Sequence, residues 1–249
     1  MIEIKNLCQE YGTKIALNNL NVTIEEGEIV GLLGHNGAGK STIIKNLVSI
    51  LRPTSGTITV DGLDLDVHRQ TIKQKIGYVP DTPDLFLQLT AEEYWDLIAA
   101  AYKLTNTEKE SKVQTLGKLF NILDYKEKTI ESFSHGMRQK VIIIGSLLAD
   151  PDIWILDEPL QGLDPQAAFH LKNIMCEQVK KGKTVLFSTH VLETAQQLCD
   201  KLIILKNGEL LYNGSVIDLL TSRPETSLET IYLKMTGCQE TASDGGYDE

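Results

Sequence analysis

A glycine-rich stretch near the N-terminus places the strongest constraint on how this chain folds. Residues 34–42 read GHNGAGKST and match the pattern G-x-x-x-x-G-K-[ST]. The required positions are occupied by Gly34, Gly39, Lys40 and Ser41. The run Ile29–Leu33 just before the loop is continuously apolar, and a helical pattern follows it. A buried strand, a glycine loop and a helix in this order form a phosphate cradle, so the sequence predicts an α/β fold built around one.

The chemistry expected of the loop follows from its backbone. Glycines let the chain curl so that successive N–H groups face inward, and the following helix adds its positive N-terminal end. The residues expected at the phosphates are Gly34, His35, Asn36, Gly37, Ala38, Gly39, Lys40, Ser41 and Thr42. Lys40 is expected to reach the β and γ phosphates of a nucleotide, and the Ser41 hydroxyl to hold Mg²⁺. The plain alternative is an ordinary glycine-rich turn, which the flanking strand and helix patterns disfavour.

Two adjacent carboxylates follow a second apolar run. Ile153–Leu156 ends in Asp157, Glu158 and Pro159. We expect Asp157 to bind Mg²⁺ through water, and Glu158 to orient an attacking water and accept its proton. A solvated strand end is the alternative when this segment is taken alone. Together with the glycine loop, the pair predicts nucleotide hydrolysis.

The rest of the hydrophobic pattern predicts two sheets. Three segments alternate apolar with polar residues and are expected to form an antiparallel sheet: Ile2–Leu7, Leu20–Ile24 and Gly56–Val60. Three continuously apolar runs are expected to form a parallel sheet covered on both faces: Ile29–Leu33, Ile153–Leu156 and Thr184–Phe187.

A helical region and a C-terminal hairpin complete the predicted organisation. Residues from about 90 to 149 are expected to be mostly helical, opened by a Thr90–Glu93 capping box with Tyr94, Leu97, Ile98 and Ala101 on one face. Asn207–Gly208 predicts a tight hairpin between 202–205 and 210–212. Thr226 and Glu229 are expected to cap a short helix that carries Leu228, Ile231, Tyr232 and Met235 on one side. One domain is expected over residues 2–235, followed by an acidic, disordered tail over 236–249.

Composition disfavours several classes of protein. The chain has 249 residues, 42% of them hydrophobic, which is enough for one large domain or two intimate ones. Its 34 Asp and Glu exceed its 24 Lys and Arg, and the net charge of -10 disfavours nonspecific attraction to nucleic acid. The N-terminus lacks a signal-peptide pattern, and apolar stretches such as Val141–Ile144 are too short to span a bilayer, so a cytosolic chain is expected. Four cysteines without metal-ligand spacing are expected to be reduced and structural.

Over nearly its whole length the chain resembles the ATP-binding subunit of an ABC transporter. Residues 134–139, Ser-His-Gly-Met-Arg-Gln, resemble the signature motif of that family. The resemblance implies that Ser134 and Gly136 reach the γ phosphate bound by the opposite subunit. His135 and Met137 depart from the commoner Gly and Gln, which leaves room for altered affinity.

Further positions match the family in order along the chain. Asp164, in Leu163-Asp164, resembles the loop that links two active sites, and His190 resembles the switch histidine that contacts the γ phosphate. Tyr11 lies where the family stacks an aromatic ring on adenine. Taken singly, Tyr11 is better explained as a packed surface aromatic and His190 as a satisfied strand-end histidine. Their order and spacing favour the nucleotide roles.

Asp81 is the larger departure, because the family usually has Gln in this loop, which faces both Mg²⁺ and the membrane subunit. A carboxylate there could contact the metal through water or serve as a plain turn residue, and both alternatives stay open. An acidic residue followed by Thr-Pro, and the stretch 228–232 near the C-terminus, resemble bacterial exporters of the ABC-2 class, with the Ecs-type ATPases as the nearest likeness.

The resemblance implies a P-loop core of the ABC type with an antiparallel β subdomain and a helical subdomain inserted at about residues 86–149. It also implies ATP and Mg²⁺ as ligands, and catalysis by Glu158, His190 and Lys40. A second nucleotide-binding subunit would complete each site, and separate transmembrane permease subunits would hold the chain at the cytoplasmic face of the membrane. The function that the resemblance implies is export of a peptide, a lipid or a drug. The alternatives are an ABC ATPase without a membrane partner, such as one serving iron–sulfur assembly, and a binding module that does not hydrolyse ATP.

Overall fold

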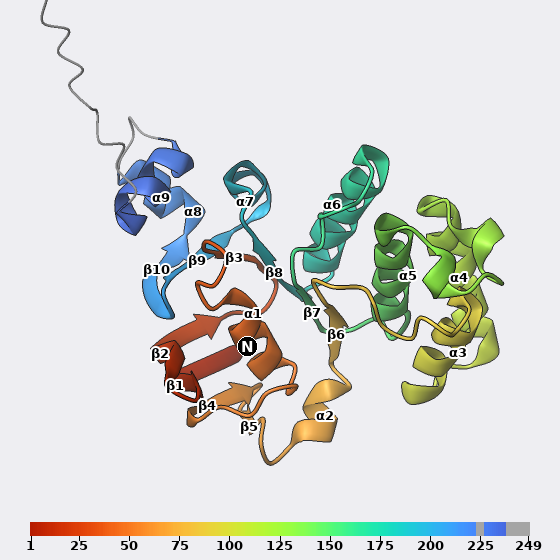
Figure 1. Ribbon diagram of the computed structural model, residues 1–249, viewed down its shortest axis with the longest axis horizontal. Coiled ribbons are helices and arrows are strands. Elements are labelled where there is room, and N and C mark those ends of the chain that lie inside the picture. Colours follow the sequence, from red (N-terminus) through yellow and green to blue (C-terminus); the bar gives the residue numbers. More distant parts are fainter. Residues whose placement is uncertain (223–226, 238–249) are drawn as a thin grey trace, which may run out of the picture.

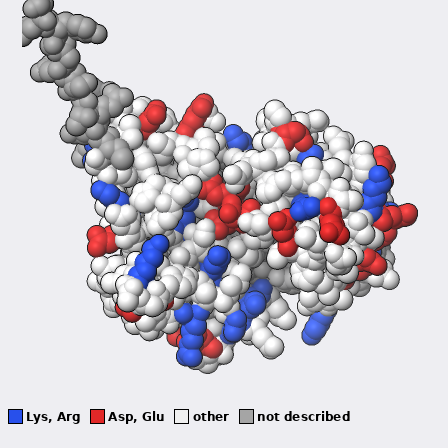
Figure 2. Space-filling model, in the orientation of Figure 1, with Lys and Arg blue, Asp and Glu red and all other residues white. Residues whose placement is uncertain are grey.

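The computed structural model describes residues 1–222 and 227–237, and it contains two β-sheets flanked by helices (Figure 1). The predicted tail therefore lies outside the described residues from 238 onward, and Cys238 lies there too. Basic side chains are interspersed with acidic ones on the face drawn in Figure 2.

The smaller sheet is antiparallel, with strand order β2-β1-β4-β5. Its strands are β1 (Ile2–Tyr11), β2 (Lys14–Ile24), β4 (Ser55–Val60) and β5 (Leu63–Asp64). Ile2 pairs with Ile24 on one side and with Val60 on the other, and all three side chains are buried. The predicted antiparallel sheet is thus confirmed. Its first two strands are longer than expected because they continue through a tight turn at residues 12–13.

The larger sheet has strand order β10-β9-β3-β8-β7-β6, with every neighbouring pair parallel except β10 with β9. Its strands are β3 (Ile29–Leu33), β6 (Ile76–Val79), β7 (Ile153–Leu156), β8 (Thr184–Thr189), β9 (Lys201–Lys206) and β10 (Glu209–Ser215). The three predicted parallel strands are confirmed, and β6 is an additional one at the sheet edge.

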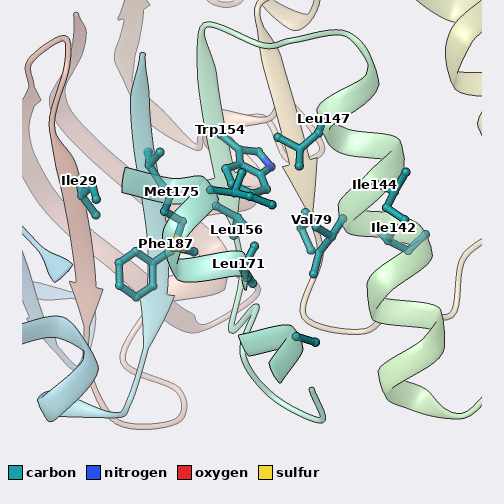
Figure 3. Close-up of a cluster of buried hydrophobic side chains, with 14 of the residues drawn as sticks. Ile29, Val79, Ile142, Ile144, Leu147, Trp154, Leu156, Leu171, Met175 and Phe187 are labelled. Carbon is teal, nitrogen blue, oxygen red and sulfur yellow. The ribbon is translucent and has the colours of Figure 1, made fainter. Parts of the chain in front are cut away.

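Two hydrophobic cores lie on opposite faces of this sheet, which explains why its strands are continuously apolar. Ile153 and Ile155 of β7 point into the core shared with the smaller sheet. Trp154 and Leu156 point into the other core (Figure 3), among side chains from the helical region. Because successive side chains of a strand point to opposite faces of the sheet, β7 contributes side chains to both cores.

The helices outside the helical lobe cover both faces of the large sheet. They are α1 (Lys40–Leu47), α2 (Arg69–Lys73), α6 (Pro165–Lys180), α7 (Leu192–Leu198), α8 (Val216–Thr221) and α9 (Leu228–Thr236). Helix α1 buries Ile43, Ile44 and Leu47 in the core shared with the smaller sheet. Helix α6 buries Leu171 and Met175 in the opposite core (Figure 3).

The inserted region forms a helical lobe beside the sheets (Figure 1). It comprises α3 (Ala91–Ala101), α4 (Asn106–Leu119), η1 (Leu123–Tyr125), η2 (Ile130–Ser132) and α5 (His135–Leu148). The predicted capping box is confirmed: the Thr90 side chain accepts from Glu93 N, and the Glu93 carboxylate accepts from Thr90 N. Val141–Ile144 is a stretch of α5 that is buried on all sides.

The face predicted for α3 was right for Tyr94 and Ile98 and wrong for Leu97 and Ala101. Tyr94 is buried and Ile98 is partly buried, but Leu97 and Ala101 are exposed. The helix instead buries Ala91, Trp95 and Ala99. The face is rotated because the Trp95 indole is sealed between α3 and α5, where its Nε1 donates to Val141 O at 3.0 Å.

The C-terminal elements agree with the predicted pattern except at one cap. Asn207 and Gly208 both have positive φ (51° and 80°), as a two-residue hairpin turn requires. Ser227 caps α9 by accepting from Thr230 N at 3.2 Å, whereas Thr226 lies outside the described residues, so the predicted Thr226–Glu229 cap is replaced by one a residue later. Leu228 and Ile231 are buried on one side of α9, with Tyr232 and Met235 partly buried, as predicted. Thr236 ends this helix and is not part of a tail.

Among residues 1–222 and 227–237, none of the helices is both long enough and apolar enough to span a bilayer.

Candidate functional site

The glycine loop connects the end of β3 to the start of α1. Gly37 and Gly39 have φ of 84° and 112°, a region that residues with a side chain rarely adopt. A Cβ at Gly39 would lie 2.7 Å from Leu17 Cδ2 and 3.1 Å from Ala16 O. Position 39 therefore needs glycine both for its backbone angle and for the close approach of β2. The loop has the curled conformation that a phosphate cradle requires.

Lys40, the first residue of α1, is only 6% exposed. Its Nζ donates to Gly34 O at 2.7 Å, lies 3.5 Å from His35 O, and lies 3.5 Å from Glu158 Oε1. A buried ammonium needs partners of this kind because isolated charge is poorly tolerated away from water. The ammonium is thus held between the loop backbone and the end of β7.

A cavity of about 420 Å³ lies over the loop. It is lined by Tyr11, Lys14, Ala16, His35, Asn36, Gly37, Gly39, Lys40, Ser41, Thr42, Asp81, Glu158, Gln161 and His190. The cavity brings together residues from five distant parts of the chain that the sequence singled out: the β1–β2 turn, the glycine loop, the segment after β6, the end of β7 and the end of β8. Tyr11 is 47% exposed, so its ring face is available at one side of the cavity.

A hydroxyl orients the two acids at the end of β7. Ser188 Oγ on β8 donates to Asp157 Oδ1 at 2.6 Å and accepts from Glu158 N at 2.8 Å. Asp157 is 1% exposed, whereas Glu158 reaches the cavity. Glu158 has φ of 47°, a rare conformation for a residue with a side chain, and its carboxylate reaches Lys40 at the end of the loop.

His190 lies next to Glu158 at the mouth of the cavity. Its Nδ1 is 3.0 Å from Glu158 Oε2, and its side chain is 56% exposed. Because an ionised carboxylate only accepts hydrogen bonds, this contact needs the proton on Nδ1. Glu158 therefore contacts Lys40 through one oxygen and His190 through the other.

The oxygen donors near the loop suit Mg²⁺ chemically. Ser41 and Asp81 line the cavity, and Asp157 lies at the adjoining strand end. In the part of the chain that the structure describes, no three His, Cys, Asp or Glu residues cluster closely enough to hold a metal by themselves. Such a site fits a cation that keeps waters and takes phosphate oxygens, as Mg²⁺ does. Burial, together with the carboxylates of Asp157 and Asp81, raises the pKa of the Tyr78 phenol, which therefore stays neutral beside them.

Six predicted site residues do not line this cavity. Gly34 and Ala38 belong to the glycine loop itself, and Asp157 directly follows β7. The other three, Ser134, Gly136 and Asp164, lie at the starts of α5 and α6. Ser134 caps α5, where its side chain accepts from Met137 N. Gly136 packs so closely on Gly162 O that a Cβ could not fit. Asp164 caps α6 by accepting from Ala167 N at 2.8 Å, and Lys140 Nζ lies 2.6 Å from its other oxygen. The Lys140 ammonium and the cap lower the pKa of the Asp164 carboxyl.

Four residues of the site were missed at the sequence level: Lys14, Ala16, Gln161 and Ser188. Gln161 stands three residues after Glu158, and Lys14 three after Tyr11, so proximity to predicted residues was an available signal. Ser188 is the first residue of the Ser-Thr-His stretch that ends at His190. Its place beside Asp157 depends on the pairing of β7 with β8.

The family model for ABC transporters matches residues 17–161. This chain belongs to the ABC transporter family. It is 37% identical over 238 residues to the ABC-type transporter ATP-binding protein EcsA of Bacillus subtilis (strain 168), covering 95% of this chain and 96% of that protein. It is 32% identical over 213 residues to the Nod factor export ATP-binding protein I of Rhizobium meliloti (strain 1021), covering 86% of this chain and 64% of that protein. The predicted family is confirmed: the chain is an ATP-binding subunit of an ABC transporter.

Solved structures of ABC cassettes share the fold. One, an ATP-binding subunit of an ABC transporter, has a TM-score of 0.89 and 36% identity, covering 95% of this chain and 99% of that one. Another, a dimeric ATP-binding cassette in a post-hydrolysis state bound to ADP and Pi, has a TM-score of 0.79 and 26% identity, covering 87% and 99%. This ABC subunit is therefore an ATPase with the fold that the sequence predicted.

Proposed function

We propose that this ATPase powers a membrane exporter, working as one of two nucleotide-binding subunits attached to separate transmembrane subunits. The observation that carries the proposal is the cavity in which the glycine loop, Glu158 and His190 meet. The similarity to a Nod factor export ATP-binding protein supports export. Similarity to a dimeric cassette supports a paired arrangement.

In the proposed site, the loop N–H groups and Lys40 bind the β and γ phosphates of ATP. Tyr11 offers its ring face to the base, which purines share, so base selectivity is modest. Ser41 and Asp157 are the residues that hold Mg²⁺, with Asp81 in reach of the same region. Bound Mg²⁺ supplies positive charge that neutralises the terminal phosphates as the bond breaks.

Glu158 accepts the proton of the attacking water in this mechanism. Its carboxylate is held from both sides, by Lys40 and His190, so its orientation is fixed before the substrate binds. His190 carries its proton on Nδ1 in that contact, which leaves Nε2 to face the γ phosphate. The catalytic residues of the proposal are therefore Glu158, His190 and Lys40.

The opposite subunit completes each site through Ser134 and Gly136 at the start of its α5. These positions lie outside the chain's own cavity and at a helix N-terminus, whose positive end suits an anionic phosphate. Asp164 links the two sites from the turn before α6. ATP binding would close the two subunits and hydrolysis would release them, which moves the membrane subunits and places the chain at the cytoplasmic face.

Copurification from solubilised membranes tests the proposal. The full chain, expressed in its native host with a tag, is expected to retain polytopic membrane proteins that mass spectrometry identifies. Recovery from the membrane fraction without any such protein would favour an ABC ATPase that works without a transmembrane partner.

A further inference from the structure

Arg138 joins the signature helix to two other segments. It lies one turn after Ser134 in α5, and its own N–H donates to Ser134 O at 3.0 Å. The guanidinium Nη1 lies 2.6 Å from Asp84 Oδ1, its Nη2 donates to Glu131 O at 2.7 Å, and its Nε donates to Ile130 O at 3.1 Å. A planar guanidinium presents its donors in a fixed fork, so three acceptors define its position closely.

The two segments that Arg138 contacts are also bonded to each other. Glu131 N donates to Leu87 O and Ile130 N to Leu89 O, both at 2.9 Å. Residues 87 and 89 are therefore bonded to residues 130–131, and Arg138 connects both segments to the first turn of α5.

Exposed apolar side chains follow Asp84 directly. Leu85 is 41% exposed and Phe86 is 49% exposed, and Phe86 has φ of 52°, which turns it outward. The Phe86 ring rests on Tyr94, with ring centroids 5.6 Å apart. Tyr94 in turn packs on Gly145 of α5 so closely that a Cβ there would lie 2.5 Å from Tyr94 Cε1. Leu85 and Phe86 are thus connected to α5 in two ways. Their neighbour Asp84 pairs with Arg138, and the Phe86 ring contacts Tyr94, which packs on Gly145.

We propose that Arg138 is a positioning residue that transmits displacement of the segment 84–89 to the signature residues Ser134 and Gly136. The inference rests on the proposed function, in which a transmembrane subunit contacts Leu85 and Phe86. When that segment shifts, Asp84 moves with it and displaces the Arg138 guanidinium to which it is paired. Because Arg138 and Ser134 are joined across one helical turn, the start of α5 shifts with it.

The Arg138–Asp84 pair is suited to this role by its partial burial. Arg138 is 21% exposed and Asp84 is 48% exposed. The Arg52–Asp66 pair offers a matched control, with a 3.1 Å contact between side chains that are 81% and 56% exposed. Charge-assisted bonds with well-fixed geometry are stronger than exposed ion pairs, which contribute little.

The test compares Asp84→Asn and Arg138→Lys with Asp66→Asn in the purified full chain. Hydrogen exchange is measured for amides 137–141, together with ATP turnover, KM for ATP and the unfolding midpoint. We expect Asp84→Asn to raise exchange of these amides by about three- to tenfold, because the first turns of α5 lose an anchor. The value of kcat falls by a similar factor, while KM and the unfolding midpoint stay near those of the wild type.

Arg138→Lys keeps the charge but loses the planar set of donors. The amide exchange rate and kcat of this variant are therefore expected to be intermediate between those of the wild type and of Asp84→Asn. Exchange equal to that of Asp66→Asn would overturn the proposal. A loss of kcat matched by a lower unfolding midpoint would also overturn it, since that marks a purely structural contact.

Both readouts use the chain without a membrane subunit, so the two proposals fail separately. Raised exchange in Asp84→Asn without copurifying membrane proteins overturns the proposed function, and with it the source of the displacement, while the anchoring of α5 by Asp84 and Arg138 stands. Unchanged exchange with membrane proteins bound overturns the positioning role alone.

Discussion

At the scale of single residues, the site contains a buried charged side chain, Lys40, that is paired with an opposite charge on Glu158. Lys40 is almost sealed, yet its ammonium has backbone carbonyls on one side and Glu158 on the other. Phosphate oxygens are stronger partners for that ammonium than neutral carbonyls, because both members of the pair are then charged. We therefore expect the Lys40 ammonium to contribute to nucleotide binding.

Lys40→Ala is expected to weaken ATP binding by about 10- to 100-fold, since a hydrogen bond to a charged group is worth about 1.5–3 kcal/mol. Isothermal titration calorimetry with ATP and Mg²⁺ measures this directly. Lys45→Ala is the control, because Lys45 lies on the same helix but is exposed. Equal affinity in the two variants would remove the phosphate-loop assignment.

Local chemistry explains which residues could be predicted. The glycine loop, Asp157 and Glu158 could be predicted from a few consecutive residues, because a single strand end and the turn after it determine where their polar groups lie. Ala16 and Ser188 carry no such signal, since each owes its position to strand pairing or to contact between distant segments. The roles of Ser134, Gly136 and Asp164 depend on a second subunit and stay predictions.

At the scale of elements, the β9–β10 hairpin supports the phosphate loop from a distance in sequence. Gly208 N donates to Ala38 O, and Asn18 N donates to Gly208 O, both at 2.9 Å. A Cβ at Gly208 would lie 2.5 Å from Ala16 O. The hairpin turn therefore packs against β2 and is hydrogen-bonded to the glycine loop.

Gly208→Ala tests this support, with Gly182→Ala as a matched control. The two glycines have nearly the same φ, 80° and 81°, but a Cβ at Gly182 would meet nothing within 4 Å. Gly182→Ala is expected to lower the free energy of unfolding by about 1–2 kcal/mol through backbone strain alone. Gly208→Ala is expected to cost about 1–3 kcal/mol more through overpacking, and it alone should weaken ATP binding. Chemical denaturation and calorimetry measure both effects, and equal costs would contradict the supporting role.

Element types were easier to predict than the faces that elements bury. The Thr90–Glu93 box and the Asn207–Gly208 turn are set by neighbouring residues, and both are confirmed. The face of α3 was predicted wrongly in part, because Leu97 fits the helical period as well as Trp95 does, and only packing against α5 distinguishes them. Strand β6 was missed because its place at the sheet edge, where Gly77 packs against Pro151, depends on pairing with β7.

At the scale of the whole molecule, an exposed apolar segment lies between the nucleotide cavity and the helical lobe. Asp81 lines the cavity, and Leu85 and Phe86 are exposed a few residues later, while Leu87 packs partly into the core. Pro80 and Pro83 disfavour a regular helix in this segment, which is consistent with side chains left outside the core.

Phe86→Ser is expected to weaken association with the membrane subunit and to lower transport, while the isolated chain still binds and hydrolyses ATP. Loss of a half-exposed ring removes apolar contact area from a docking surface and little from the core. Val67→Ser is the control, because Val67 is 74% exposed in the loop before α2. Copurification yield and reconstituted transport report the effect. Loss of folding or ATP binding in isolated Phe86→Ser would instead show that the ring belongs to the core.

Glu158→Gln tests most directly whether ATP is hydrolysed between two chains with Glu158 as the general base. Size-exclusion chromatography with ATP and Mg²⁺ is combined with phosphate release, and Glu193→Gln, an exposed position on α7, serves as the control. We predict that Glu158→Gln binds ATP, hydrolyses it at least about 10²-fold more slowly, and accumulates as a dimer. A monomer with turnover near that of the wild type would contradict this mechanism and move the base role toward His190.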